Sequence, residues 1–223
     1  MQKLSLAQVK KAISSRAKIF FWKLIWSGSL RKPYYLFLKI KTKKIKKINL
    51  CSAGVRICGY TNVDRLPPVD VVYDINYPLP FQDNSIDTAV MIHGIYYFYY
   101  KKAKEIISEI YRVLKNGGIV RVSFIDLEIF AKKYLGKDYN FYNQKLPNDR
   151  ERFVGKTIGD KFISNAYYYG GIKYFYDFES LKSHFEEAGF KDIKKCNFGE
   201  SQIEEIKEID NRPDISGFLE AIK

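Results

Sequence analysis

The sequence is poor in the residues that form disulfides or bind structural metals. Its 223 residues include three cysteines and two histidines. Cys51, Cys58 and Cys196 are too few and too scattered for a disulfide framework or a zinc site, so we expect no metal and a reducing, cytoplasmic setting. No run of about 18 apolar residues is present, which excludes an obvious membrane span. The apolar residues near Phe20 lack the pattern of a signal peptide.

Acidic residues are absent from the first part of the chain. Residues 1–47 contain 14 lysines and arginines and no aspartate or glutamate, while the whole chain has a net charge of +13. The remaining residues are nearly neutral, with 24 basic and 25 acidic side chains. We therefore predict a basic arm over residues 1–46 and a separate body over residues 47–223. In residues 5–26, apolar side chains recur at three- and four-residue steps, which predicts a helix.

Three interpretations of the basic arm remain open. Its helices pack on the body with their lysines in solvent, or they lie on an anionic membrane surface, or they bind nucleic acid. The aromatic side chains at Phe20, Phe21, Trp22 and Trp26 favour a lipid headgroup interface, which would place the protein at the inner face of a membrane. Nucleic acid is the least favoured partner because no recognition motif accompanies the charge.

The body alternates short apolar strands with amphipathic helices. The expected strands are Ile48–Leu50, Tyr60–Val63, Val69–Tyr73, Ile86–Ile92, Gly118–Phe124, Ile193–Phe198 and Phe218–Ile222. The expected helices are residues 101–118, stopped by Asn116-Gly117-Gly118, and residues 180–190, closed by Gly189. This alternation predicts an α/β fold with a mostly parallel sheet and helices on both faces. Residues 127–178 show no clear period, and we expect a lid or substrate loop there.

Four stretches of the body resemble one family. They are PLPFQDNSIDTAVMIHG (78–94), EIYRVLKNGGIVRVSFIDLE (109–128), YDFESLKSHFEEAGFKDIKKCNFGES (176–201) and NRPDISGFLEAIK (211–223). Together they are similar to class I S-adenosylmethionine-dependent methyltransferases of the type 11 kind, in a branch that often neighbours glycosyltransferases. The resemblance implies a Rossmann-like sheet of seven strands whose last strand is antiparallel. It also implies that S-adenosylmethionine lies across the carboxyl ends of the first strands.

The loop after the first strand departs from the family pattern. Cys51, Ser52 and Ala53 stand where the family has a glycine-rich sequence, and only Gly54 is kept. A non-glycine residue held at positive φ costs about 1–2 kcal/mol. We therefore expect the change to weaken cofactor binding without abolishing it. The resemblance implies that residues 51–54 border the cofactor, that Asp64 accepts hydrogen bonds from its ribose, and that Asp74 holds its adenine amine. The alternatives are a surface turn for Asp64 and a loop cap for Asp74.

Two residues are candidates for chemistry. His93 follows the fourth strand and is a candidate general base or cofactor contact, although a lone histidine is more often structural. Asp126 ends the fifth strand and is a candidate for holding the substrate or accepting its proton; the alternative is a helix N-cap. No other catalytic motif is present.

The resemblance leaves three functional hypotheses. The first is O-methylation of a saccharide or surface-glycan precursor, with a small-molecule or glycan acceptor. The second is a methyltransferase-fold protein that has lost catalysis and acts as a scaffold, because the loop glycines are replaced. The third is methylation of a nucleic acid. The tyrosine-rich stretch IYYFYY (95–100), which follows the fourth strand, is expected at the rim of the site.

Overall fold

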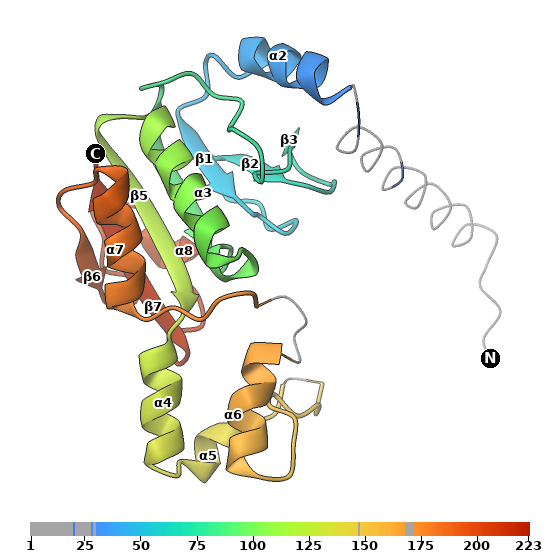
Figure 1. Cartoon of the computed structure of the whole chain (residues 1–223), viewed down its shortest axis with the longest axis vertical. Coiled ribbons are helices and arrows are strands. Elements are labelled where there is room, and N and C mark those ends of the chain that lie inside the picture. The colour runs from blue at the N-terminus through green and yellow to red at the C-terminus, as the bar shows by residue number, and fades with distance from the viewer. Residues whose placement is uncertain (1–19, 21–27, 29, 147, 168–171) are drawn as a thin grey trace.

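The computed structural model describes residue 20, residue 28 and residues 30–146, 148–167 and 172–223. Seven strands form one sheet in the order β3-β2-β1-β4-β5-β7-β6. The strands are β1 (Lys47–Leu50), β2 (Thr61–Asp64), β3 (Val71–Val72), β4 (Ile86–Ile92), β5 (Leu114–Ile125), β6 (Lys194–Cys196) and β7 (Ser216–Ile222). The helices are α2 (Arg31–Lys41), η1 (Ile95–Tyr97), α3 (Tyr100–Val113), α4 (Leu127–Leu135), α5 (Tyr139–Tyr142), α6 (Ile158–Tyr167), α7 (Phe178–Ala188) and α8 (Ile206–Ile209). Figure 1 shows the arrangement.

The pairing of the strands matches the predicted fold class. Strands β1 to β5 pair in parallel, and β7 lies antiparallel between β5 and β6. Along the chain, the sheet first grows from β1 to β2 and β3 on one side, and then from β4 to β5 on the other. The strand order therefore reverses between β1 and β4, which are neighbours in the sheet. In open α/β sheets a ligand binds at such a reversal, outside the carboxyl ends of the strands.

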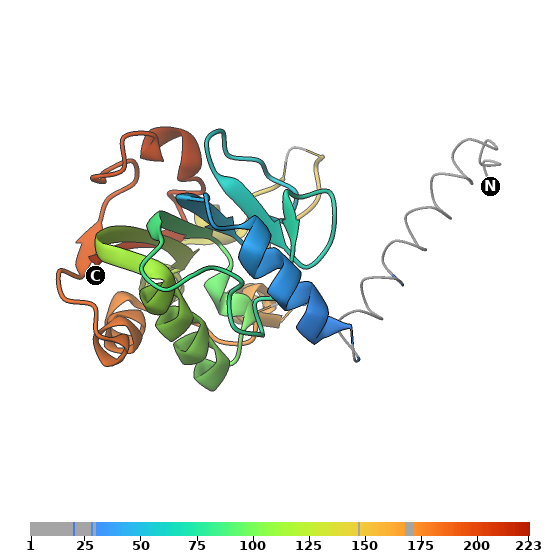
Figure 2. The ribbon, with the colours of Figure 1, turned by 90° about the horizontal axis from the view of Figure 1, so that it is seen from above.

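Helices cover both faces of the sheet, but unequally. α3 and α7 lie on one face, with α2 on the same side, and α8 lies on the other (Figure 2). The stripe of α3 is buried as predicted, from Ala103 to Val113. The face under α8 has a smaller core in which Ile203, Ile206 and Ile209 pack with Tyr60 and Val90.

The end of α3 differs from the prediction. The helix ends at Val113, and Leu114 already pairs with Ile86 of β4. The register then shifts, so that Thr88 pairs with Ile119. Gly117, at φ 77°, lies in the resulting bulge instead of stopping the helix. α7, in contrast, is closed by Gly189 at φ 103°, as predicted.

Two segments lie outside the sheet, and the first is more ordered than the sequence suggested. Residues 127–178 contain α4, α5 and α6, which lie past the carboxyl ends of the parallel strands (Figure 1). Phe130, Phe141, Tyr142 and Phe153 form an aromatic core among them. α2, in the predicted arm, packs on the body through the buried Leu38. The helix predicted over residues 5–26 lies outside the described residues, apart from residue 20.

Candidate functional site

Three adjoining clefts run along the carboxyl edge of the parallel strands. The adenosyl cleft, named for its expected ligand, is lined by Cys51, Ala53, Asp64, Arg65, Tyr73, Asp74, Ile75, Asn76, Tyr97, Phe98, Tyr99, Lys102 and Lys173. The loop cleft lies between residues 51–58 and residues 205–212. The third cleft lies between the sheet edge and residues 145–153. Tyr97 lines all three, so they form one continuous trough.

The backbone at the loop cleft is unusually strained. Among the described residues, seven that are not glycine have positive φ, and four of these border this cleft: Cys51, Ala53, His93 and Arg212. The first two have φ 55° and 47°, at the positions where the family pattern has glycine. Such conformations each cost about 1–2 kcal/mol and persist where the surrounding structure enforces them. The glycine-type loop conformation is therefore kept with non-glycine residues.

The side chain of Cys51 fits because its neighbour is a glycine. A Cβ atom at Gly94 would lie 2.8 Å from Cβ of Cys51 and 2.7 Å from Cγ of Met91. Gly94 therefore leaves the space that the side chain of Cys51 occupies. Burial raises the pKa of the Cys51 thiol, and the charges of Asp64 and Asp74 raise it further. Cys51 is therefore a neutral packing residue rather than a nucleophile.

Asp64 and Asp74 both face the adenosyl cleft. The carboxylate of Asp64 accepts hydrogen bonds from the backbone N–H groups of Ala53 at 2.9 Å and Leu66 at 3.2 Å. It thereby joins the end of β2 to the loop and keeps further lone pairs for a ligand. One oxygen of Asp74 accepts from the backbone and side chain of Asn76, as in a loop cap. Its other oxygen has no partner among the described residues.

His93 is buried at the centre of the trough. Its Nε2 lies 3.2 Å from Oγ of Ser216, and that hydroxyl donates to the carbonyl of Arg212 at 2.6 Å. The hydroxyl therefore accepts from Nε2–H, which leaves Nδ1 as an acceptor without a partner. Burial and then the charge of Arg212 lower the pKa of His93 to about 4. The imidazole is neutral near pH 7 and is a weak base.

Asp126 is placed differently from the other candidates. Its side chain accepts a hydrogen bond from the backbone N–H of Glu128 at 2.9 Å and caps the start of α4. Burial raises the pKa of this carboxyl group. Asp126 lines none of the three clefts, so the geometry favours the helix-cap interpretation. The predicted cofactor residues, in contrast, come together in one trough with His93, except for Gly54, which lines none of the clefts.

The third cleft involves the segment that was expected to be a lid or substrate loop, because five of its lining residues fall within residues 127–178. Its lining is aromatic and aliphatic, with three cations and no carboxylate among the described residues: Tyr96, Tyr97, Ile125, Lys145, Leu146, Arg152, Phe153, Ile172, Arg212 and Ile215. Lys145 pairs with Asp149, and Arg152 pairs with Asp214. Arg212 is exposed, forms no ion pair with a described residue, and borders the loop cleft as well. The sequence signals for this region were the tyrosine-rich stretch after β4 and the absence of a clear period in residues 127–178; Arg212 was not singled out.

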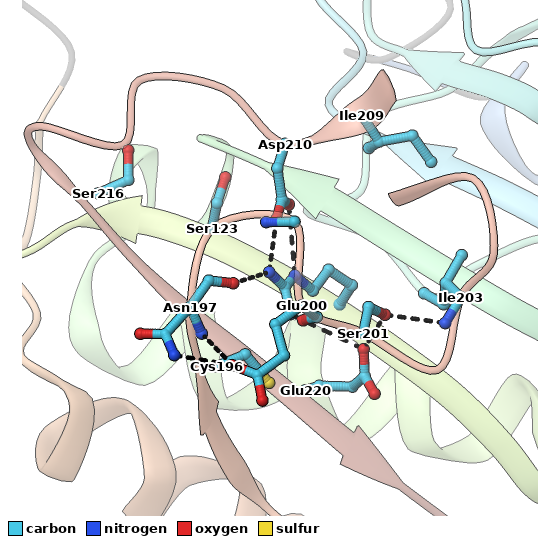
Figure 3. A network of polar contacts seen from close by, with 12 residues as sticks. Ser123, Cys196, Asn197, Glu200, Ser201, Ile203, Ile209, Asp210, Ser216 and Glu220 are labelled. Atoms are coloured by element: carbon cyan, nitrogen blue, oxygen red, sulfur yellow. Dashed lines mark hydrogen bonds and ion pairs between the residues drawn. The ribbon is translucent and has the colours of Figure 1, made fainter. Parts of the chain in front are cut away.

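Arg212 is held in place by a buried polar network beneath residues 197–212. Arg121 on β5 and Asp210 form a fully buried ion pair. Figure 3 shows Asp210 and other members of this network, among them Asn197, Ser201 and Glu220. Arg121 also donates to the carbonyls of Glu200 at 2.8 Å and Asn197 at 3.2 Å. Glu220 accepts from the hydroxyl of Ser201 and from a backbone N–H. The network fixes this segment as one wall of the loop cleft.

Known proteins are similar to this chain in sequence. Residues 41–204 match the ubiE/COQ5 methyltransferase family. A ubiquinone/menaquinone biosynthesis C-methyltransferase UbiE of Hydrogenovibrio crunogenus is 31% identical over 171 residues, which cover 73% of this chain and 62% of that protein. A protein of the same name from Neisseria gonorrhoeae is 35% identical over 53% of this chain and 45% of its own length. The chain thus spans less than two thirds of these relatives.

Among solved structures, an S-adenosylmethionine-dependent methyltransferase from Mesorhizobium loti aligns with 88% of this chain and 99% of its own, at 14% identity and a TM-score of 0.45. The family match extends over most of the chain, from the last residue of α2 into the segment 197–212 that forms one wall of the loop cleft. It confirms the predicted class of S-adenosylmethionine-dependent methyltransferases, and the chain belongs to the ubiE/COQ5 methyltransferase family.

Proposed function

We propose that this chain transfers a methyl group from S-adenosylmethionine to a small acceptor in the third cleft. The observation that carries the proposal is the continuous trough, with carboxylates at one end, the strained loop in the middle and cations among aromatic rings at the other. Methyl transfer is an in-line displacement, so the enzyme mainly aligns two bound molecules and excludes water. Adjoining clefts provide that alignment.

The residues at the first two clefts fit a polar cofactor. Buried groups without partners border them: Oγ of Ser52 and Nδ1 of His93. Such groups are costly unless a ligand or water satisfies them. The carboxylate of Asp64 would accept from the ribose hydroxyls, and the free oxygen of Asp74 would accept from the adenine amine. S-adenosylmethionine, when bound, supplies an electrophilic methyl group on a positively charged sulfur.

The lining of the third cleft favours an acceptor that combines an apolar ring with a negative charge. Tyr97, which is 49% exposed, offers an aromatic surface for a planar ring, while Tyr96 and Phe153 line the cleft but are almost fully buried. Arg212 offers a guanidinium group to a carboxylate or phosphate. The similar proteins are named as C-methyltransferases, which supports a ring carbon as the methylated atom. O-methylation of a saccharide remains an untested prediction.

Calorimetric titration with S-adenosylhomocysteine tests the cofactor site. We expect binding by the intact chain and a loss of about 10- to 150-fold in affinity for Asp64→Asn, because hydrogen bonds to a charged group contribute about 1.5–3 kcal/mol. Asp192→Asn is the matched control, since Asp192 is exposed and lies away from the trough. A folded protein that binds no cofactor would refute the proposal and favour the scaffold hypothesis.

The acceptor is tested with a labelled methyl donor and matched pairs of phenols, with and without a carboxylate. We expect methyl transfer to the phenols that carry a carboxylate. We also expect Arg212→Met to reduce the rate of this transfer by a larger factor than it reduces the affinity for the cofactor. Transfer to neutral phenols alone would contradict the negative charge on the acceptor.

A further inference from the structure

α2 has two unlike faces. One face joins the body: Leu38 is buried, the hydroxyl of Tyr34 donates to the carbonyl of Val72 at 2.9 Å, and the hydroxyl of Thr42 lies 2.6 Å from the carbonyl of Pro80. The other face is apolar and open to solvent. Leu36, Phe37 and Ile40 are 60%, 57% and 68% exposed.

These three side chains form a single patch. Positions 36, 37 and 40 share one side of a helix, because residues three and four apart are neighbours on its surface. Single exposed apolar residues are ordinary, but a contiguous apolar patch marks an interaction surface. We call Leu36, Phe37 and Ile40 the α2 patch.

The helix that carries the α2 patch, and the turn after it, have basic side chains and no acidic ones. Lysines and arginines accompany the patch along the helix and the turn that follows: Arg31, Lys32, Lys39, Lys41, Lys43 and Lys44. No acidic residue occurs anywhere in residues 1–47. An apolar stripe bordered by lysines is the pattern of a helix that lies in a lipid headgroup region. Lysine stems also reach along apolar surface while their ammonium groups stay in water.

A hollow lies beside the α2 patch. It has a volume of about 410 Å³ and is lined by Arg31, Lys32, Tyr35, Leu36, Tyr73, Tyr77 and Pro78. The guanidinium group of Arg31 lies 4.0 Å from the centre of the Tyr77 ring. Two cations at the rim of an aromatic hollow match a lipid phosphate above its acyl chains. In the described part of the chain, no helix could cross a bilayer.

We propose that the α2 patch docks the protein on the surface of an anionic phospholipid bilayer. The apolar side chains enter the headgroup boundary, and the surrounding lysines face lipid phosphates. A second copy of the chain is a poor occupant because its α2 would bring the same positive charge. Nucleic acid would leave the three apolar side chains without partners. The surface stands apart from the proposed methyl transfer and holds whether or not the trough is active.

Sedimentation of the full chain with vesicles tests this surface. We expect binding to phosphatidylcholine vesicles that contain phosphatidylglycerol and little binding to phosphatidylcholine alone. Phe37→Ser/Ile40→Ser should weaken binding at least tenfold. Lys39→Glu/Lys43→Glu should weaken it further, because each basic residue contributes about fivefold near an anionic surface and the reversal adds repulsion. High salt should weaken the binding of the intact chain.

Leu135→Ser is the matched control, because Leu135 is 77% exposed on α4, away from α2. It should bind as the intact chain does, and all variants should keep the same thermal unfolding midpoint. Equal sedimentation of the α2 variants and the intact chain would overturn the proposal and place any lipid contact elsewhere. A concentration-dependent dimer that Phe37→Ser/Ile40→Ser abolishes, without vesicle binding, would overturn it in favour of a second copy.

Discussion

The two walls of the loop cleft are built in opposite ways. Residues 51–54 form one wall with small side chains, strained backbone and hydrogen bonds to the nearby Asp64. Residues 197–212 form the other wall and are held from below by a buried ion pair to the sheet. The first wall depends on local backbone geometry, and the second depends on a distant side chain. His93 lies between them and touches the second wall through Ser216.

This difference determines how each wall can fail. A strained loop already carries a cost, so a better-suited residue can improve it. A buried ion pair is different: losing one partner leaves a charge in an apolar setting, and the segment it holds is destabilised. Changes at the second wall should therefore have larger effects than changes at the first.

The largest effect is expected from Asp210→Ala. The variant leaves the fully buried Arg121 with only its longer contact to Glu220, at 3.8 Å, which lowers the free energy of unfolding by about 3 kcal/mol. Urea denaturation measures this loss. The control is Arg121→Met/Asp210→Leu/Glu220→Gln, which removes all three buried charges and should recover most of the stability. A loss below about 0.5 kcal/mol, which is ordinary for a surface substitution, or no recovery in the triple variant, would show that the ion pair does not anchor the second wall.

The same contrast explains what the sequence could predict. β1, β2, β4 and β7 lie within two residues of their predicted positions, and the loop, Asp64 and Asp74 border the expected cleft. These features follow from short apolar runs and from residues that come directly after a strand. The family resemblance then supplied their expected roles.

The acceptor side was less predictable because its contacts join distant parts of the chain. Arg121 and Asp210 are 89 positions apart, and nothing local marks them as partners. α4, α5 and α6 are short and pack through aromatic side chains, so the sequence contains no long apolar stripe that would predict them. Arg212 lies at the site because of how residues 197–210 fold, which the local sequence does not indicate. Asp126 is the opposite case: its position at the end of a strand suggested a site residue, but its carboxylate caps a helix.

An intermediate effect is expected from pH, through His93 between the two walls. Its pKa of about 4 in the folded chain lies below the ordinary value of 6.5, so the unfolded chain binds a proton first as the pH falls. The stability contributed by neutral His93 is present above pH 6.5 and is lost as the pH falls towards 4. From pH 7 to pH 5 the loss should be about 2 kcal/mol.

Denaturant unfolding at both pH values measures this loss in the intact chain and in His93→Asn. Asparagine tolerates positive φ and does not titrate, so the variant should lose about 2 kcal/mol less than the intact chain. His184, whose pKa burial also lowers, is present in both proteins and cancels in the difference. Equal losses in the two proteins would mean that His93 is not held neutral between the walls.

The smallest effect, and the one of opposite sign, is expected at the first wall from Ala53→Gly. Ala53 is exposed at φ 47°, and a Cβ atom in that conformation costs about 1–2 kcal/mol. Glycine removes this strain but gives the unfolded chain more freedom, worth about 0.5–1 kcal/mol. The net gain is about 0.5–1 kcal/mol, which raises the melting midpoint by about 1–4 °C in a chain of this size.

Calorimetric melting measures this gain, with Ala131→Gly in α4 as the matched control. That helical site has no strain to relieve, so the same substitution there should lower the midpoint. If both variants lower it, Ala53 is not strained, and the two walls differ less than their backbone angles indicate.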